Sequence, residues 1–107
     1  MLDAELKTIL RELKVRLSDL YGARLAQLVL YGSQARGDAE DGSDIDVLVV
    51  LRGDVNASRE LDAVGDVIYD VSNRHDAVVS CVFVTEERYS RGEGPLIRNV
   101  RREGVSL

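Results

Sequence analysis

The run from Asp44 to Leu51 restricts the fold of this chain more than any other segment. Aliphatic side chains occupy both sides of the extended chain there, and only the first half of the run carries charge. A strand that is apolar on both sides is covered on both faces along most of its length. The run therefore predicts an α/β fold in which helices cover a small sheet.

Two long helices that could cover such a sheet are predicted by apolar residues recurring every three or four positions. The first extends over residues 2–20, and Gly22 is its natural stop. The second is capped by Asn56 or Ser58 and continues as far as His75. The apolar stripes consist of Leu2, Leu6, Ile9, Leu10, Leu13, Leu17 and Leu20 in the first helix and Leu61, Val64, Ile68 and Val71 in the second.

Two further strands and a terminal helix complete the predicted order of elements. Residues 25–31 and 77–84 are short apolar runs of strand length, and residues 85–87 begin another turn of helix. Pro95 suits the first turn of a last helix that ends near Gly104. Because no repeat or linker interrupts this order, residues 1–107 are predicted to form one domain.

The charge of the chain restricts the class of partner. The formal charge of −5 argues against direct nucleic-acid binding, because phosphate contacts need clustered cations. Arg98, Arg101 and Arg102 gather near the C-terminus, where they form either a surface for a partner or a solvated helix face.

The cysteine content and the lack of a targeting or membrane segment predict the cellular compartment. The only cysteine, Cys81, lies in an apolar run, which excludes an intramolecular disulfide and predicts a buried structural thiol. No signal peptide precedes the first helix and no apolar stretch approaches the length of a membrane span. We therefore expect a cytoplasmic protein with no membrane partner.

Asp44 and Asp46 form a candidate metal site. Alternate residues of a strand point the same way, so the two carboxylates project together from one edge. Carboxylates held that close repel each other unless a cation lies between them. A hard divalent cation such as Mg²⁺, held by one or two carboxylates and by substrate phosphates, fits this pair.

The segment before the acidic pair has the composition of a phosphate-binding turn. Gly32 follows a predicted strand and lets the backbone approach a phosphate, while Ser33 can donate from its amide and its hydroxyl. Arg36 either neutralises phosphate charge or ties the loop to nearby acids. Ser43 closes the acidic loop of residues 37–42, and we assign it to the nucleotide-binding set with the other three.

The pattern Gly-Ser-x-Ala-Arg-Gly at residues 32–37, followed by a short acidic loop and Ser-Asp-x-Asp at 43–46, resembles the signature of the DNA polymerase beta-like nucleotidyltransferase superfamily. The short chain is similar to the minimal nucleotidyltransferases, the MNT family. The resemblance implies a nucleotidyltransferase fold with a small mixed sheet, ATP as substrate, and Mg²⁺ on Asp44 and Asp46. MNT proteins are commonly paired with HEPN-domain toxins, which implies an antitoxin that transfers AMP from ATP to a toxin tyrosine and forms a hetero-oligomer with it.

The chain departs from the full family pattern at a third carboxylate. The matching place is Ser80, and the nearest acid is Asp76, which is either a catalytic substitute or a solvated residue at the strand entry. His75 is interpreted as structural or exposed, and Tyr31 as packing on the sheet rather than stacking on adenine. Two alternatives therefore remain, a catalytically weak antitoxin that neutralises its partner by covering it and a transferase that acts on a small molecule.

Overall fold

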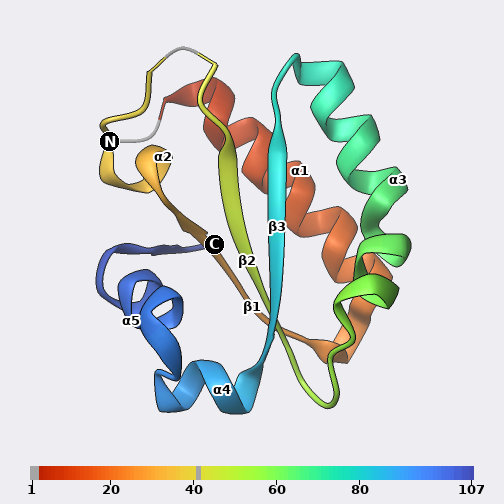
Figure 1. Cartoon of the computed structure of the whole chain (residues 1–107). Helices are drawn as coiled ribbons and strands as arrows, with labels where there is room; N and C mark the ends of the chain where they lie inside the picture. The colour runs from red at the N-terminus through yellow and green to blue at the C-terminus, as the bar shows by residue number, and fades with distance from the viewer. Residues whose placement is uncertain (1–2, 41) are drawn as a thin grey trace.

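The computed structural model describes residues 3–40 and 42–107, which form a mixed sheet with helices on both faces (Figure 1). The strands are β1 (Leu25–Tyr31), β2 (Ile45–Leu51), β3 (Val79–Thr85) and β4 (Val105–Ser106), in the order β3-β2-β1-β4. β2 is parallel to β3 and antiparallel to β1, and β4 is antiparallel to β1. The predicted small mixed sheet is confirmed.

Two apolar clusters lie on opposite faces of the sheet. On one face, α1 (Ala4–Tyr21) and α3 (Ala57–His75) pack against Ile45, Val47 and Val49 of β2. On the other face, α5 (Gly94–Glu103) packs against Leu48 and Val50, with α4 (Glu86–Arg91) beside it. The prediction that β2 is covered on both faces is confirmed. Within the described ranges, no helix is both long and apolar enough to cross a membrane.

The first helix differs from its predicted stripe at both ends. Asp3 caps α1, since its side chain accepts a 2.7 Å hydrogen bond from the Leu6 amide. Leu2, the predicted start, lies outside the described residues. Leu20 was predicted to be buried and is 45% exposed, because Tyr21, four residues after the buried Leu17, takes the next place in the stripe. The helix then ends at Gly22, as predicted, and one 3₁₀ turn (η1, Gly22–Arg24) leads into β1.

In α3 the predicted stripe is wrong at Leu61, which is 50% exposed. Glu60 is buried there instead, 1% exposed, four residues before the buried Val64. Its carboxylate accepts hydrogen bonds from the Tyr21 hydroxyl, the Asn56 amide and the Arg59 guanidinium, each at 3.3 Å. Burial acts to raise the pKa of Glu60, but the hydrogen bonds from Asn56 and Arg59 and the charges of Arg24 and Arg59 hold that pKa below its ordinary value.

The C-terminal strand β4 was not predicted. It has only two residues, which pair with Val29 and Leu30 of β1. It is reached through Gly104, where an added Cβ would lie 2.5 Å from the Val100 carbonyl oxygen and 2.6 Å from Cγ1 of Val29. The missing side chain lets the end of α5 pack directly on β1.

Candidate functional site

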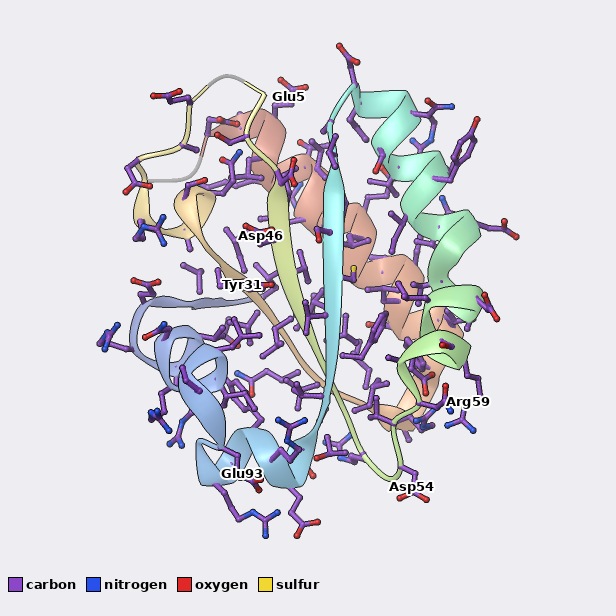
Figure 2. All side chains as sticks on the ribbon, in the orientation of Figure 1. Glu5, Tyr31, Asp46, Asp54, Arg59 and Glu93 are labelled. Atoms are coloured by element: carbon purple, nitrogen blue, oxygen red, sulfur yellow. The ribbon has the colours of Figure 1, made fainter. Side chains whose placement is uncertain are left out.

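The centre of the site is one row of residues across the sheet. Asp46 of β2 pairs with Tyr31 on the antiparallel strand β1 and with Ser80 on the parallel strand β3. Alternate residues of a strand point the same way, so Asp46 lies on the same side of β2 as Leu48 and Val50. Both of these residues belong to the apolar cluster around α5, so the row occupies the face that α5 covers. Figure 2 labels Asp46 and Tyr31 on their adjacent strands. The register therefore puts Ser80, the place of the absent third carboxylate, beside Asp46.

Gly32 lies directly against Asp46. Its backbone has φ 76° and ψ −158°, a conformation that residues with a side chain almost never adopt. An added Cβ would lie 2.5 Å from Oδ2 of Asp46. The short helix α2 (Ser33–Arg36) starts there, and the Gly32 carbonyl accepts hydrogen bonds from the amides of Ala35 and Arg36, both at 3.1 Å. The structure thus brings the Gly32-Ser33 turn and the acidic pair together.

The Asp46 carboxylate is harder to ionise than an ordinary aspartate. Burial and then the charge of Asp44 raise the pKa of Asp46, and the charge of Arg36 only partly opposes this. Among residues 3–40 and 42–107, no three His, Cys, Asp or Glu side chains gather where they could hold a metal ion. The described part of the site therefore offers a pair of carboxylates with a serine hydroxyl beside them.

Arg36 makes contacts that match one of its two predicted roles. Its Nε lies 3.2 Å from Oδ2 of Asp38, and its Nη1 lies 3.3 Å from Oε1 of Glu103. The hydrogen bond to Asp38 is the main cause of the raised pKa of Arg36. In this conformation Arg36 ties the loop and the end of α5 to α2.

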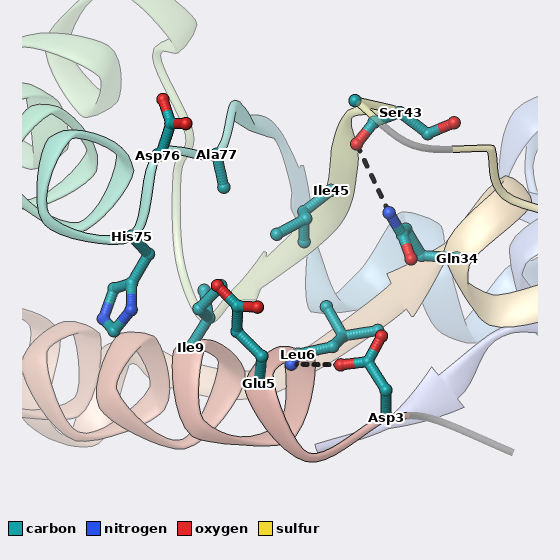
Figure 3. A pocket seen from close by; sticks show the side chains of 11 residues that line it. Asp3, Glu5, Leu6, Ile9, Gln34, Ser43, Ile45, His75, Asp76 and Ala77 are labelled. Carbon is teal, nitrogen blue, oxygen red and sulfur yellow. Dashed lines mark hydrogen bonds between the residues drawn. The ribbon is translucent and has the colours of Figure 1, made fainter.

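Ser43 is likewise engaged within the loop. Its hydroxyl accepts a 3.0 Å hydrogen bond from the Glu40 amide, and its carbonyl accepts a 3.3 Å bond from Nε2 of Gln34 (Figure 3). Gln34 was missed in the sequence analysis, although its place within the 32–37 motif was a signal. It joins α2 to the segment that leads into Asp44.

Asp76 lies between the end of α3 and the start of β3. It is the exposed C-cap residue of α3, in a left-handed conformation with φ 50° and ψ 49°. With Gln34, Ser43 and Ile45 it lines a cavity of about 150 Å³ (Figure 3). Ile45 faces α1, on the opposite side of β2 from Asp46. The catalytic role of Asp76 stays a prediction, and the structure does not group it with Asp44 and Asp46.

Three other residues discussed in the sequence analysis, His75, Cys81 and Tyr31, contribute to contacts between elements or to packing. Nε2 of His75 lies 3.0 Å from Oε2 of Glu12, which joins α3 to α1. Burial raises the pKa of the Cys81 thiol to about 12, so this thiol stays protonated at neutral pH. Tyr31 packs against the cluster around α5, and burial, followed by the charge of Asp46, raises the pKa of its phenol.

The sequence of the chain is similar to a family model and to a named relative. A family model described as "Nucleotidyltransferase domain" matches residues 10–105. A relative from Methanocaldococcus jannaschii, named "Putative protein adenylyltransferase", is 32% identical over 99 residues, which cover 92% of this chain and 93% of the relative.

Two solved structures have a similar fold. One, described as a "putative minimal nucleotidyltransferase", gives a TM-score of 0.61 at 25% identity and covers 95% of each chain. The other, a toxin-antitoxin structure with AMP-PNP, gives a TM-score of 0.58 at 18% identity and covers 88% of this chain and 68% of that chain.

Proposed function

Because the chain belongs to the nucleotidyltransferase domain family and is a nucleotidyltransferase, we propose that it is a Mg²⁺-dependent antitoxin that transfers AMP from ATP to a tyrosine of a HEPN-domain toxin. The nucleotidyltransferase fold predicted from the sequence is confirmed by the solved structures. The name of the Methanocaldococcus relative supports a protein as the acceptor. The toxin-antitoxin structure with AMP-PNP supports ATP as the donor and a toxin as the partner.

The observation that carries the proposal is the contact of the Gly32 turn with the acidic pair. Burial and the charge of Asp44 raise the pKa of Asp46, and a hard cation would offset this cost of ionisation. The missing side chain of Gly32 lets its backbone lie against the Asp46 carboxylate. Asp44 and Asp46 would hold Mg²⁺, which would neutralise charge on the attacking and leaving oxygens.

The residues of the chain itself would mainly position the reactants. Gly32 and Ser33 would bind the triphosphate through backbone amides and the serine hydroxyl. The acceptor oxygen attacks the α-phosphorus, the bond from that phosphorus to the bridging oxygen breaks, and pyrophosphate leaves with the electron pair. The tyrosine proton passes to a base, for which Asp76 is the candidate from the sequence and solvent is the alternative.

A second function, neutralisation of the partner by covering it, is favoured by Ser80. Asp46 has a hydroxyl rather than a carboxylate as its neighbour on β3. A serine is a poor general base at neutral pH, so a chain with this site could bind nucleotide and transfer it slowly.

The test is transfer of label from α-labelled ATP to a purified HEPN-domain protein in the presence of Mg²⁺. We expect the labelled group on a tyrosine, located by mass spectrometry, and a loss of about a thousandfold or more for Asp44→Asn with Asp46→Asn. Asp62→Asn with Asp66→Asn removes the same charge from exposed positions of α3 and should transfer normally. A parent protein that silences its partner without labelling it would overturn the enzymatic proposal and establish the covering one.

A further inference from the structure

The basic residues of the described ranges divide into two groups. Eight arginines lie within 4.0 Å of a carboxylate oxygen. Six exposed basic residues have no such partner among residues 3–40 and 42–107: Lys7, Arg11 and Lys14 on α1, and Arg98, Arg101 and Arg102 on α5. Cations without partners are unexpected in a chain whose formal charge is −5.

The three arginines of α5 surround an open hollow of about 310 Å³. Arg101 donates to the Ser90 carbonyl at 3.1 Å, and Arg102 donates to Oδ1 of Asn99 at 2.8 Å. Both acceptors are neutral, so the charge of the guanidinium groups is not compensated by these contacts. A planar guanidinium binds a carboxylate through two parallel hydrogen bonds, and the hollow therefore suits acidic side chains.

The hollow lies on α5, beside the end of α4, and the same helix also contacts the site already described. The helix α5 lies beside β1 (Figure 1), and its Ile97 and Val100 pack on the face of the sheet that carries Asp46. The last residue of α5, Glu103, contacts Arg36 of α2, which belongs to the Gly32-Ser33 turn. The α1 cations belong to a helix on the opposite face. A protein whose hydroxyl reaches Asp46 approaches on the α5 side of the sheet.

We propose that the arginine hollow of α5 binds a short glutamate- or aspartate-rich segment of the acceptor protein and so holds its hydroxyl near the site. The inference rests on the proposed function for the identity of the acceptor. Nucleic acid is the less favoured ligand, because its phosphates need an extended track of cations, whereas three arginines on a ten-residue helix match two or three carboxylates.

The first experiment measures binding alone, by fluorescence anisotropy of labelled hexaglutamate without ATP or Mg²⁺. We expect Arg98→Glu with Arg102→Glu to weaken binding by about tenfold or more, and the milder Arg98→Gln with Arg102→Gln to weaken it less. Arg101 is left unchanged because it also holds α5 to α4. Lys7→Glu with Arg11→Glu makes the same change of charge on the other face and should leave the affinity within about twofold.

Three results of this experiment would overturn the inference. The first is that the parent does not bind hexaglutamate. The second is that the α1 variant loses as much affinity for hexaglutamate as the α5 variant, and the third is that the parent binds an oligothymidylate more tightly than hexaglutamate. Circular dichroism of each variant shows whether the fold persists. If the charge reversal unfolds the chain, the binding of hexaglutamate is measured with the glutamine variant instead.

The second experiment uses transfer, with random copolymers of glutamate and tyrosine or of lysine and tyrosine as acceptors. We expect the α5 variants to raise KM for the glutamate copolymer while kcat and ATP affinity stay as in the parent. An unchanged KM would contradict docking at α5. A parent that labels no acceptor at all would instead contradict the proposed function, and the binding experiment would still decide the role of α5.

Discussion

At Gly32 a single residue serves both the turn and the acidic pair. Its φ and ψ angles lie in a region available almost only to glycine, so the chain can turn sharply from β1 into α2. The same missing side chain leaves room for Oδ2 of Asp46. A substitution at Gly32 therefore changes the carboxylate as well as the backbone.

We predict that Gly32→Ala lowers the free energy of unfolding by about 1–3 kcal/mol and displaces Asp46, so that Mg-dependent ATP binding is weakened at least about tenfold. Chemical denaturation and titration calorimetry measure the two effects. Gly37→Ala is the control, because Gly37 also has a positive φ, of 81°, but nothing lies within 4 Å of its added Cβ. Parental ATP affinity in Gly32→Ala would place the phosphate site elsewhere.

Ser80 and Asp76 are two positions from which a general base could act, and they can be separated by mutation. Ser80 pairs with Asp46, whereas Asp76 precedes β3 and lines the cavity with Ser43 and Ile45. We therefore predict that Ser80→Asp raises the single-turnover rate of transfer at saturating ATP.

The same assay tests Asp76→Asn. The hypothesis that Asp76 is the base predicts a rate lower by about a hundred- to ten-thousandfold with ATP affinity nearly unchanged. The alternative, that Asp76 is only a solvated residue at the strand entry, predicts a rate within about twofold of the parent. A large fall would establish Asp76 as the base.

At the level of elements, the end of α5 depends on how closely it approaches β1. Gly104 has no room for a side chain between the Val100 carbonyl and Val29. This contact directs the chain into β4, which adds the last strand to the sheet through Leu30 and Val29. It also holds Glu103 where it reaches Arg36, so α5 and α2 support each other.

We predict that Gly104→Ala lowers the free energy of unfolding by about 1–3 kcal/mol, because the added methyl group overlaps a backbone oxygen and a buried valine. Thermal and denaturant unfolding measure the change. Gly65→Ala in α3 is the matched control, since nothing lies within 4 Å of its added Cβ, and alanine should there stabilise the helix by about 0.5–1 kcal/mol. If both variants were stabilised, the close packing at Gly104 would be contradicted.

At the level of the whole molecule, the central strand separates two different tasks. Its odd-numbered residues pack with α1 and α3 into the larger apolar cluster. Its even-numbered residues begin with Asp46 and continue as the smaller cluster under α5. One strand thus supplies the core on one face and the site on the other, which explains how so short a chain carries both.

The sequence by itself determined the elements and the chemistry of the motif. Hydrophobic periodicity is a local property, so α1, α3 and the three longer strands were predictable to within a few residues. The end of a strand at Gly32 and the strand position of Asp46 were likewise predicted from neighbouring residues. Local sequence alone is therefore enough to identify the Gly-Ser turn and the acidic pair.

Only the tertiary structure decided which distant residues meet. The pairing of Asp46 with Ser80 depends on strand register across more than thirty residues. The burial of Glu60 depends on donors from Tyr21, Asn56 and Arg59, and β4 depends on the fit of Gly104 against β1. The sequence of one segment does not predict which distant segment it will contact. Packing and hydrogen bonding act between side chains that become neighbours only in the folded chain.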